Sequence, residues 1–232
     1  MSGRDHLTIN DMLSRVPLGT TELFPRRDRE DGEERFLSVH QNWDCKPGRL
    51  EWHNRLSLEE NPWFGSRAVA RQPIFLLPAP IVTFRGPAKD IVDFYSTGTH
   101  AFFLSERLMA LFDRLDPGTM DRRPITIEAR NGAKVPFYMA MPDRSIEAVD
   151  TDRTSVLIKD EDFAGEWFRS VTFPDGAVFR VDGLASVQHF TDLDLSGWFW
   201  SRELIEAAQS EGIKGVRTIS CANTSGFTVD RL

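Results

Sequence analysis

The chain has few of the residues that would make a disulfide-bonded, metal-bound or membrane-spanning protein. Its 232 residues include only two cysteines, Cys45 and Cys221, which are far apart and have no metal-ligand spacing. A disulfide framework is therefore excluded as the organising principle, and we expect reduced thiols. The longest apolar runs, such as residues 74–77, are far too short to cross a bilayer. Residues 1–13 contain no apolar signal-peptide core, so a cytoplasmic protein is expected.

Positive charge is also in short supply. The 28 Lys and Arg residues are outnumbered by 35 Asp and Glu residues, which gives a net charge of −7. A dedicated nucleic-acid binder is usually basic, and an anionic membrane surface would repel an acidic protein. We therefore expect neither nucleic acid nor a membrane as the partner. An acidic chain is suited to a partner that is itself basic.

The common catalytic motifs are absent. No phosphate-binding loop and no Gly-x-Gly-x-x-Gly sequence occurs, and the five histidines are scattered without a His-x-x-x-His pair. The sequence therefore predicts no catalytic residue, no metal ion and no cofactor.

One polar group leaves an enzymatic alternative open. His189, Asp192 and Asp194 are close in sequence, and strand residues two apart face the same side, so both carboxylates could meet one divalent cation. Such a site would suit a metal-dependent transferase or hydrolase. The simpler interpretation is a polar loop before Trp198, because short Asp-x-Asp patterns are common by chance.

Two segments far apart in the chain have the same arrangement. Residues 102–108 read Phe-Phe-Leu-Ser-Glu-Arg-Leu, and residues 198–204 read Trp-Phe-Trp-Ser-Arg-Glu-Leu. An aromatic run suits a buried strand end, and the Ser hydroxyl accepts a hydrogen bond from a backbone N–H of the first helical turn. We predict two strand–cap–helix units with Ser105 and Ser201 as N-caps. Neither serine lies in a nucleophile elbow.

Apolar periodicity supports a helix after each serine. The first runs through residues 108–115 and the second through residues 202–210. Gly212 is placed for the left-handed position that ends the second helix. The two similar units are consistent with an internal duplication, in which only the helices align.

Turn residues predict that the strands pair as hairpins. Asn131-Gly132 separates residues 125–128 from residues 135–139, and a Pro-Asp-Gly turn separates residues 167–173 from residues 178–181. Together with the helices, this pattern predicts an α+β fold with mainly antiparallel sheets built from hairpins and two Ser-capped helices.

Four regions are expected along the chain. Prolines at 73, 78, 80 and 87 predict an edge strand or an extended crossing segment, because proline donates no ladder hydrogen bond. Self-association through that segment would make the protein a structural or adaptor protein, and the oligomeric state stays open. The regions are a loop-rich or flexible arm (1–35), an N-terminal subdomain or extension (36–88), an α+β domain (89–222) and a loose tail (223–232).

Two groups of residues are candidates for partner binding. Asp160, Glu161 and Asp162 form an acidic run, which is either a solvated turn or a patch complementary to a basic protein. Trp63 and Phe64 lie in a loop, where exposed aromatic side chains are suited to anchor a protein partner.

Four segments of the C-terminal two thirds occur in a recognisable order: residues 102–108, 178–181, 198–204 and 211–216, the last containing Gly-Ile-Lys-Gly at 212–215. In this order they resemble the immunity protein 11 family of bacterial polymorphic-toxin systems, whose members have a similar ending before the last strand. It covers roughly residues 90–220. The resemblance implies a cytoplasmic protein that blocks a cognate secreted toxin stoichiometrically. It carries over no catalytic residue and no fixed toxin contact. Many such toxins are basic nucleases, which an acidic blocker would meet quickly.

Overall fold

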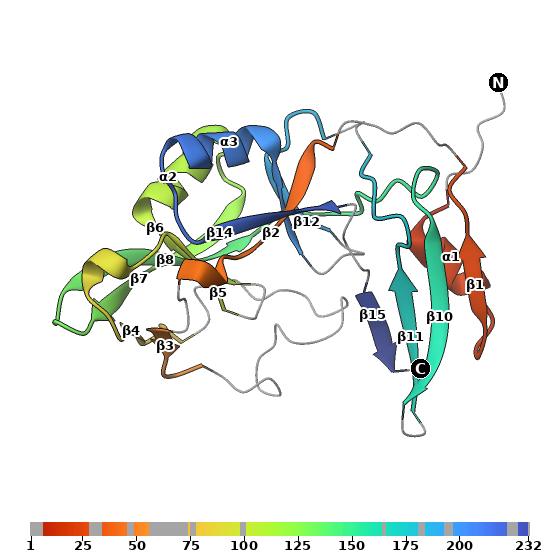
Figure 1. Ribbon diagram of the computed structural model, residues 1–232, viewed down its shortest axis with the longest axis horizontal. Coiled ribbons are helices and arrows are strands. Elements are labelled where there is room, and N and C mark those ends of the chain that lie inside the picture. Colours follow the sequence, from red (N-terminus) through yellow and green to blue (C-terminus); the bar gives the residue numbers. More distant parts are fainter. Residues whose placement is uncertain are drawn as a thin grey trace.

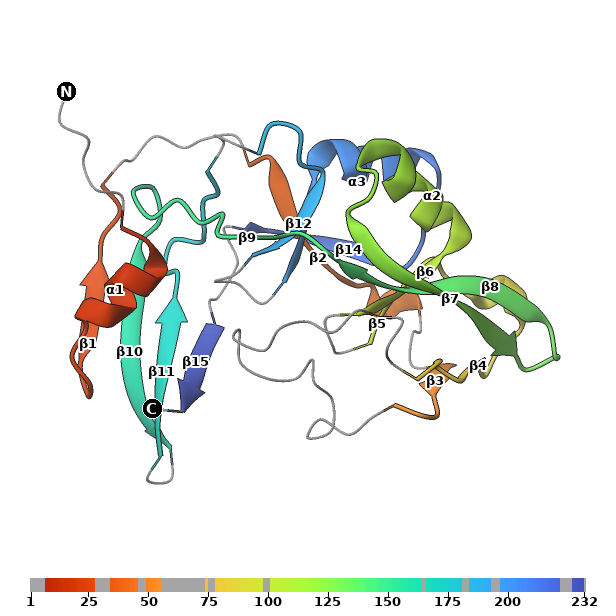
Figure 2. The same ribbon diagram turned by 180° about the vertical axis from the view of Figure 1, so that it is seen from behind.

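The computed structural model has an α+β fold with mainly antiparallel sheets, which confirms the predicted fold class (Figure 1). Three sheets follow one another along the long axis, and two helices lie side by side over the part where the six-stranded and five-stranded sheets meet (Figures 1 and 2). The structure describes residues 7–27, 34–45, 49–55, 74, 78–97, 101–163, 166–180, 184–192, 197–221 and 227–231.

The largest sheet has six strands. Among its described strands, β4 and β7 pair in parallel and the other pairs are antiparallel. The predicted central hairpin is confirmed: β7 and β8 pair in antiparallel register, and Gly132 has a φ of +78° in the turn. In spatial order the strands are β3 (Leu50–Trp52), β4 (Val82–Phe84), β7 (Met120–Ala129), β8 (Lys134–Pro142), β6 (Phe102–Ser105) and β5 (Phe94–Ser96).

The five-stranded sheet occupies the middle of the molecule and the four-stranded sheet one end (Figure 1). In the five-stranded sheet the order is β14 (Val216–Ser220), β2 (Phe36–Gln41), β13 (Trp198–Ser201), β12 (His189–Asp192) and β9 (Ser145–Ile146). In the four-stranded sheet it is β1 (Thr21–Phe24), β10 (Val156–Phe163), β11 (Glu166–Thr172) and β15 (Phe227–Arg231). Short 3₁₀ turns are η1 (Trp43–Cys45) and η4 (Ala88–Asp90).

Helices α2 (Glu106–Leu115) and α3 (Arg202–Ser210) each begin at a serine. The Ser105 hydroxyl accepts from the Leu108 N–H at 3.3 Å, and the Ser201 hydroxyl accepts from the Leu204 N–H at 3.1 Å. The apolar faces of both helices share one buried cluster with Trp198 and Trp200 of β13. There the ring of Phe112 stacks on Trp198 at 5.3 Å and meets Trp200 edge-on.

The two Ser-capped units are similar beyond their helices. In each, a short antiparallel strand pair leads into the helix, β5–β6 before α2 and β12–β13 before α3. Each cap serine donates its backbone N–H to the carbonyl of the residue before the first strand, Asp93 in one unit (2.9 Å) and Gln188 in the other (2.8 Å). Its hydroxyl donates to the side chain of that same residue. The similarity therefore includes a strand pair and a polar residue that supports the cap.

Both ends of the chain differ from the sequence-based expectation. Residues 1–35, expected to be a loop-rich arm, contain helix α1 (Ile9–Arg15) with a Thr8–Asp11 capping box, and also strand β1. The expected loose tail contains β15, which pairs with β11. Strands β1 and β15 belong to the four-stranded sheet, and Ile9 and Met12 of α1 belong to the buried cluster beside it. Contacts with strands far away in the sequence therefore stabilise both ends of the chain, although these ends show little apolar periodicity.

The predicted hairpin between residues 167–173 and 178–181 is wrong, and so is the edge-strand alternative for the proline-rich segment. β11 pairs with β10 and β15, and within the described part of residues 178–181 Phe179 forms an isolated bridge with Val149. The proline-rich segment contains β4, which is not an edge strand because it lies between β3 and β7; its described prolines stand outside the strand. The strands of residues 36–88 therefore belong to the same sheets as strands of residues 89–222.

Within the described residues, none of the helices combines the length and apolar character needed to cross a bilayer.

Candidate functional site

Gln41, the last residue of β2, joins the five-stranded sheet to the edge of the six-stranded sheet. Its side-chain carbonyl accepts from the Ser96 N–H at 2.9 Å, and its amide nitrogen donates to the Phe94 and Gly215 carbonyls, each at 3.2 Å. The side chain is buried. The Gln41 side-chain amide therefore makes hydrogen bonds to the backbone of β5, to the Ser96 N–H and the Phe94 carbonyl, as a neighbouring strand would.

Gly215 completes this junction, because it lies directly against β5. Its φ is +95°, and a Cβ at this position would lie 2.6 Å from the Phe94 carbonyl oxygen and 2.8 Å from Cγ2 of Val92. Only glycine combines this backbone conformation with such a close approach.

We expect Gly215→Ala to destabilise the protein strongly. The left-handed conformation alone costs about 1–3 kcal/mol for a side-chain-bearing residue, and the contact with β5 adds to it. Gly132→Ala is the matched control, since Gly132 also has a positive φ but no atom lies within 4 Å of its added Cβ. Urea unfolding should therefore show a larger loss for Gly215→Ala than for Gly132→Ala. Equal losses of unfolding free energy in the two variants would mean that β5 shifts to accommodate the Cβ of residue 215 without a cost in stability.

Asp93 links the start of α2 to the chain that follows α3. Its carboxylate accepts from the Ser105 hydroxyl at 2.7 Å, from Arg107 Nε and Nη2, both at 2.6 Å, and from the Lys214 N–H at 2.8 Å. Arg107 also donates to the carbonyl of Gly212, which has a φ of +66° just beyond α3. Burial alone would raise the pKa of Asp93, but the hydrogen bonds from Arg107, Lys214 and Ser105 outweigh it and hold the pKa below its usual value. The carboxylate is therefore a structural anion that fixes β5.

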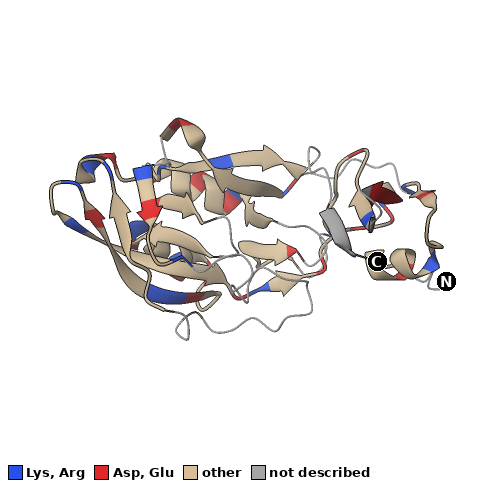
Figure 3. Ribbon diagram, turned by 90° about the horizontal axis from the view of Figure 1, so that it is seen from below, with Lys and Arg blue, Asp and Glu red and all other residues tan. Residues whose placement is uncertain are grey.

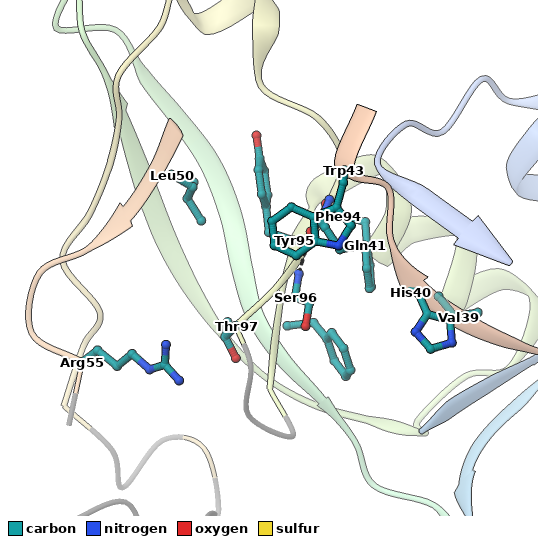
Figure 4. A pocket seen from close by; sticks show the side chains of 11 residues that line it. Val39, His40, Gln41, Trp43, Leu50, Arg55, Phe94, Tyr95, Ser96 and Thr97 are labelled. Carbon is teal, nitrogen blue, oxygen red and sulfur yellow. Dashed lines mark hydrogen bonds between the residues drawn. The ribbon is translucent and has the colours of Figure 1, made fainter. Parts of the chain in front are cut away.

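A cavity of about 490 Å³ lies beside this junction, between β2, β3 and β5 (Figure 4). We call it the seam pocket. Phe102, which forms part of its wall, stacks on Phe94 at 5.4 Å and packs against Trp198 at 4.6 Å, so the wall is continuous with the buried core. The pocket is lined by Val39, His40, Gln41, Trp43, Leu50, Arg55, Phe94, Tyr95, Ser96, Thr97 and Phe102.

The seam pocket combines aromatic walls with polar and basic groups. Trp43 is 72% exposed, which is unusual for the largest apolar side chain. His40 Nε2 is hydrogen-bonded to the Ser38 hydroxyl at 2.9 Å, and partial burial together with the nearby Arg217 lowers its pKa. Arg55 lies on the opposite side of the pocket from His40 (Figure 4). None of the described residues that line the pocket is acidic.

The acidic run, for which the sequence offered a solvated turn or a patch for a basic partner, lies on strand β10. Asp160 is buried and pairs with Arg169, so its carboxylate faces the interior, contrary to the expectation of a solvent-facing patch. Glu161 and Asp162 are exposed, and Glu161 accepts from Lys159 at 2.6 Å. Trp63 and Phe64 lie outside the described residues.

His189, the centre of the metal-site alternative, is fully buried and has both ring nitrogens engaged. Trp198 Nε1 is a donor only, so its 3.2 Å contact makes His189 Nδ1 the acceptor. Nε2 then carries the proton and donates to the Thr119 hydroxyl at 2.7 Å. Asp192 is buried too and accepts from the Ala148 N–H at 2.7 Å, while Asp194 lies outside the described residues. Across the described parts of the chain, no cluster of His, Cys, Asp and Glu has the arrangement of a metal site.

The sequence was compared with models of known protein families. The model of an immunity protein family, Imm11, matches residues 35–223. The chain belongs to this family. The Imm11 match begins well before the region of resemblance recognised in the sequence, and it includes β2, which supplies His40 and Gln41 to the seam pocket. No curated protein matches the sequence.

Sequence reasoning did not find the seam pocket in this Imm11 protein. Its lining comes from three stretches, residues 39–55, 94–97 and 102, which only the fold brings together. The one local signal is Trp43, a large apolar residue between Asn42 and Asp44. A tryptophan between two polar residues is compatible with either burial or exposure, so the sequence alone does not assign it.

Proposed function

We propose that this protein is a bacterial immunity protein that binds a cognate secreted toxin of a polymorphic-toxin system and neutralises it by stoichiometric blocking in the cytoplasm. The observation that carries this proposal is the Imm11 family match over residues 35–223. The proposed action is binding without turnover. It is supported by the two described residues of the three that suggested an enzyme, because His189 and Asp192 are committed to hydrogen bonds inside the core.

The charge of the chain supports a basic toxin domain, such as a nuclease. A net charge of −7 attracts a cationic partner over distances of about 10 Å at moderate ionic strength and speeds encounter. Acidic and basic residues are interspersed over the described ribbon (Figure 3). Exposed Glu161 and Asp162 are candidates for contact with such a domain, and Trp63 and Phe64 remain predicted anchors.

Co-expression with the toxin domain encoded by the neighbouring gene tests the proposal. We expect the immunity protein to restore growth of a bacterial host that carries the toxin and to form a one-to-one complex with an interface of about 1,600 Å² in total. Light scattering on the co-purified complex measures the stoichiometry. A basic toxin should also associate more slowly as salt concentration rises. A non-cognate immunity protein is the control. The proposal would be contradicted if the protein gave no protection against the cognate toxin and formed no complex with it.

A further inference from the structure

We propose that the outer edge of β1 receives an extended segment of the toxin, which adds a strand to the four-stranded sheet and carries an apolar residue next to a Lys or Arg. The inference rests on the proposed function, because it names the contact through which the immunity protein holds the toxin. Figures 1 and 2 show β1 at the outer side of this sheet, beside β10.

Two residues of β1 direct their backbone hydrogen-bonding groups away from the sheet. Hydrogen-bonded and non-hydrogen-bonded residue pairs alternate along an antiparallel ladder. Thr20 belongs to a hydrogen-bonded pair, because its carbonyl accepts from the Asp160 N–H at 3.2 Å. Thr21 and Leu23 therefore belong to the alternate pairs, and their N–H and C=O groups face the outer edge. No described residue pairs with β1 there, and such an edge is a template for a further strand.

Apolar side chains are exposed beside this edge. Leu23 is 54% exposed, and Leu18 in the loop before β1 is 70% exposed. They are two of the four large hydrophobic residues that are exposed in the described part of the chain. An apolar residue of an added strand would pack beside Leu23 and remove apolar surface from water.

The charge of Glu22 selects a basic segment. Glu22 is exposed, and it lies on the opposite face of β1 from Leu23 because successive strand residues alternate. None of the ion pairs within the described parts of the chain uses Glu22. An added strand would place one residue beside Leu23 and its sequence neighbour beside Glu22. Opposite charges in such cross-strand pairs are favourable, so the complement of this edge is an apolar residue adjacent to Lys or Arg.

A second copy of the chain fits the edge less well. A two-fold antiparallel pairing of β1 with itself, centred on Glu22, would oppose two like charges. The same pairing centred on Leu23 would oppose Thr21 to Pro25, which has no N–H to donate. A toxin segment is subject to neither constraint.

The edge is held in place before a partner arrives. On one side of Leu18, the Pro17 carbonyl accepts from Arg169 at 3.2 Å. On the other side, the Gly19 N–H donates to the Asp160 carboxylate at 2.7 Å. A preorganised site loses less conformational entropy when it binds, so this anchoring favours strand addition.

Strand β1 also lies outside the residues that the Imm11 model matches, whereas β10 and β11 lie inside them. The outer edge is therefore contributed by a part of this chain that the family match does not include. Such a position suits a contact that recognises one cognate toxin.

The first test separates the backbone contact from the side chain at position 21. Thr21→Pro removes an outward N–H and no hydrogen bond to β10, whereas Thr21→Ala removes only the side chain. In calorimetry with the toxin domain, Thr21→Pro should bind at least tenfold more weakly than Thr21→Ala, which should bind as the wild type does. Thermal unfolding verifies that both variants are folded. Wild-type binding together with values within twofold for these two variants would overturn the inference and leave the proposed function standing.

The second test separates local from long-range charge. Glu22→Lys should weaken binding at least fivefold relative to Glu206→Lys. Glu206 is exposed on α3, away from the four-stranded sheet, so the same change in net charge acts there only at long range (Figure 1). Equal weakening in the two variants would refute the basic segment and with it the inference.

Amide hydrogen exchange, followed by NMR, needs no substitution. In the free protein the amides of Thr21 and Leu23 should exchange faster than those of Glu22 and Phe24, and the toxin domain should slow exchange at Thr21 and Leu23 at least tenfold. Unchanged exchange at both in the complex would overturn the inference. A dimer of the free protein that Thr21→Pro abolishes in light scattering would assign the edge to a second copy instead. If the toxin does not bind the wild type, the proposed function fails and the inference fails with it.

Discussion

Lowering the pH from about 6.5 to about 4 is expected to reduce the free energy of unfolding by about 3 kcal/mol through His189 alone. Burial is the main cause of its low pKa, about 4 against an ordinary value of 6.5; the Asp116 carboxylate opposes the shift and Arg144 adds to it. As pH falls through 6.5 the unfolded chain takes up a proton that the folded chain refuses. Stability is therefore complete above pH 6.5 and is lost progressively towards pH 4.

The hydrogen bonds explain why the folded protein resists this proton. Nδ1 of His189 already accepts from Trp198, and a proton placed there would face the indole N–H. The Nε2 proton is donated to Thr119, whose hydroxyl donates in turn to the Asp116 carbonyl at 2.6 Å. With the ring neutral, each group in the series donates to the next, from the Trp198 indole through His189 and the Thr119 hydroxyl to the Asp116 carbonyl. Protonation would leave a buried donor without an acceptor in an aromatic environment.

Urea unfolding between pH 4 and pH 8, followed by tryptophan fluorescence, measures this effect. His189→Gln should show a flatter dependence on pH than the wild type across the window from 6.5 to 4, even though it is less stable at pH 8. His53→Gln is the matched control, since His53 is exposed next to β3 and its ring is hydrogen-bonded to the Thr83 hydroxyl at 2.7 Å. Parallel curves for the wild type and His189→Gln would show that the histidine is not responsible.

Asp160→Ala is expected to lower the free energy of unfolding by about 3–5 kcal/mol, because it leaves a buried guanidinium without its counter-ion. Asp160 is fully buried, and Arg169 is only 8% exposed. The carboxylate accepts from Arg169 Nε and Nη2 at 2.7 and 2.8 Å and from the Gly19 N–H at 2.7 Å. Arg169 also donates to the carbonyls of Leu13 and Pro17 at the end of α1. The pair therefore fastens α1 to the four-stranded sheet.

Glu161→Ala is the matched control for Asp160→Ala. Glu161 is the next residue of β10, but its carboxylate is exposed and pairs with exposed Lys159, so its loss should cost less than about 1 kcal/mol. The double variant Asp160→Leu with Arg169→Met should recover part of the loss, because it removes both buried charges. Chemical denaturation at pH 7 compares all three. An Asp160→Ala protein as stable as Glu161→Ala would refute the buried-pair interpretation.

The same ion pair adds a second, lower pH window. The hydrogen bonds from Arg169 are the main cause that lowers the pKa of Asp160, against the opposing effect of burial, and the Gly19 N–H contributes further. A carboxyl group with a lowered pKa in the folded state stabilises the protein above its ordinary pKa, near 4, and this contribution is lost as the pH falls further. It therefore fades below the range in which His189 acts, and the two effects separate in a pH series.

Local signals in the sequence were sufficient for the two Ser-capped helices and for the central hairpin. A cap hydroxyl, a helical apolar face and an Asn-Gly turn each act within a few residues, so the pattern and the structure agree at Ser105, Ser201 and Gly132. The partner of β11 was not predictable in this way. A Pro-Asp-Gly turn marks a change of direction, but it does not say which distant strand completes the sheet.

The sequence by itself determined the α+β class, the capped helices and the likeness to an immunity family, because these depend on residue type and short-range order. Only the tertiary structure decided that Asp160 faces inward, that α1 and β15 are ordered parts of a sheet region, and that Trp43, Arg55 and Phe102 surround one pocket. The physical reason is the same in each case. Burial and proximity between residues tens of positions apart depend on which strands pair, and strand pairing is settled by the packing of the whole chain.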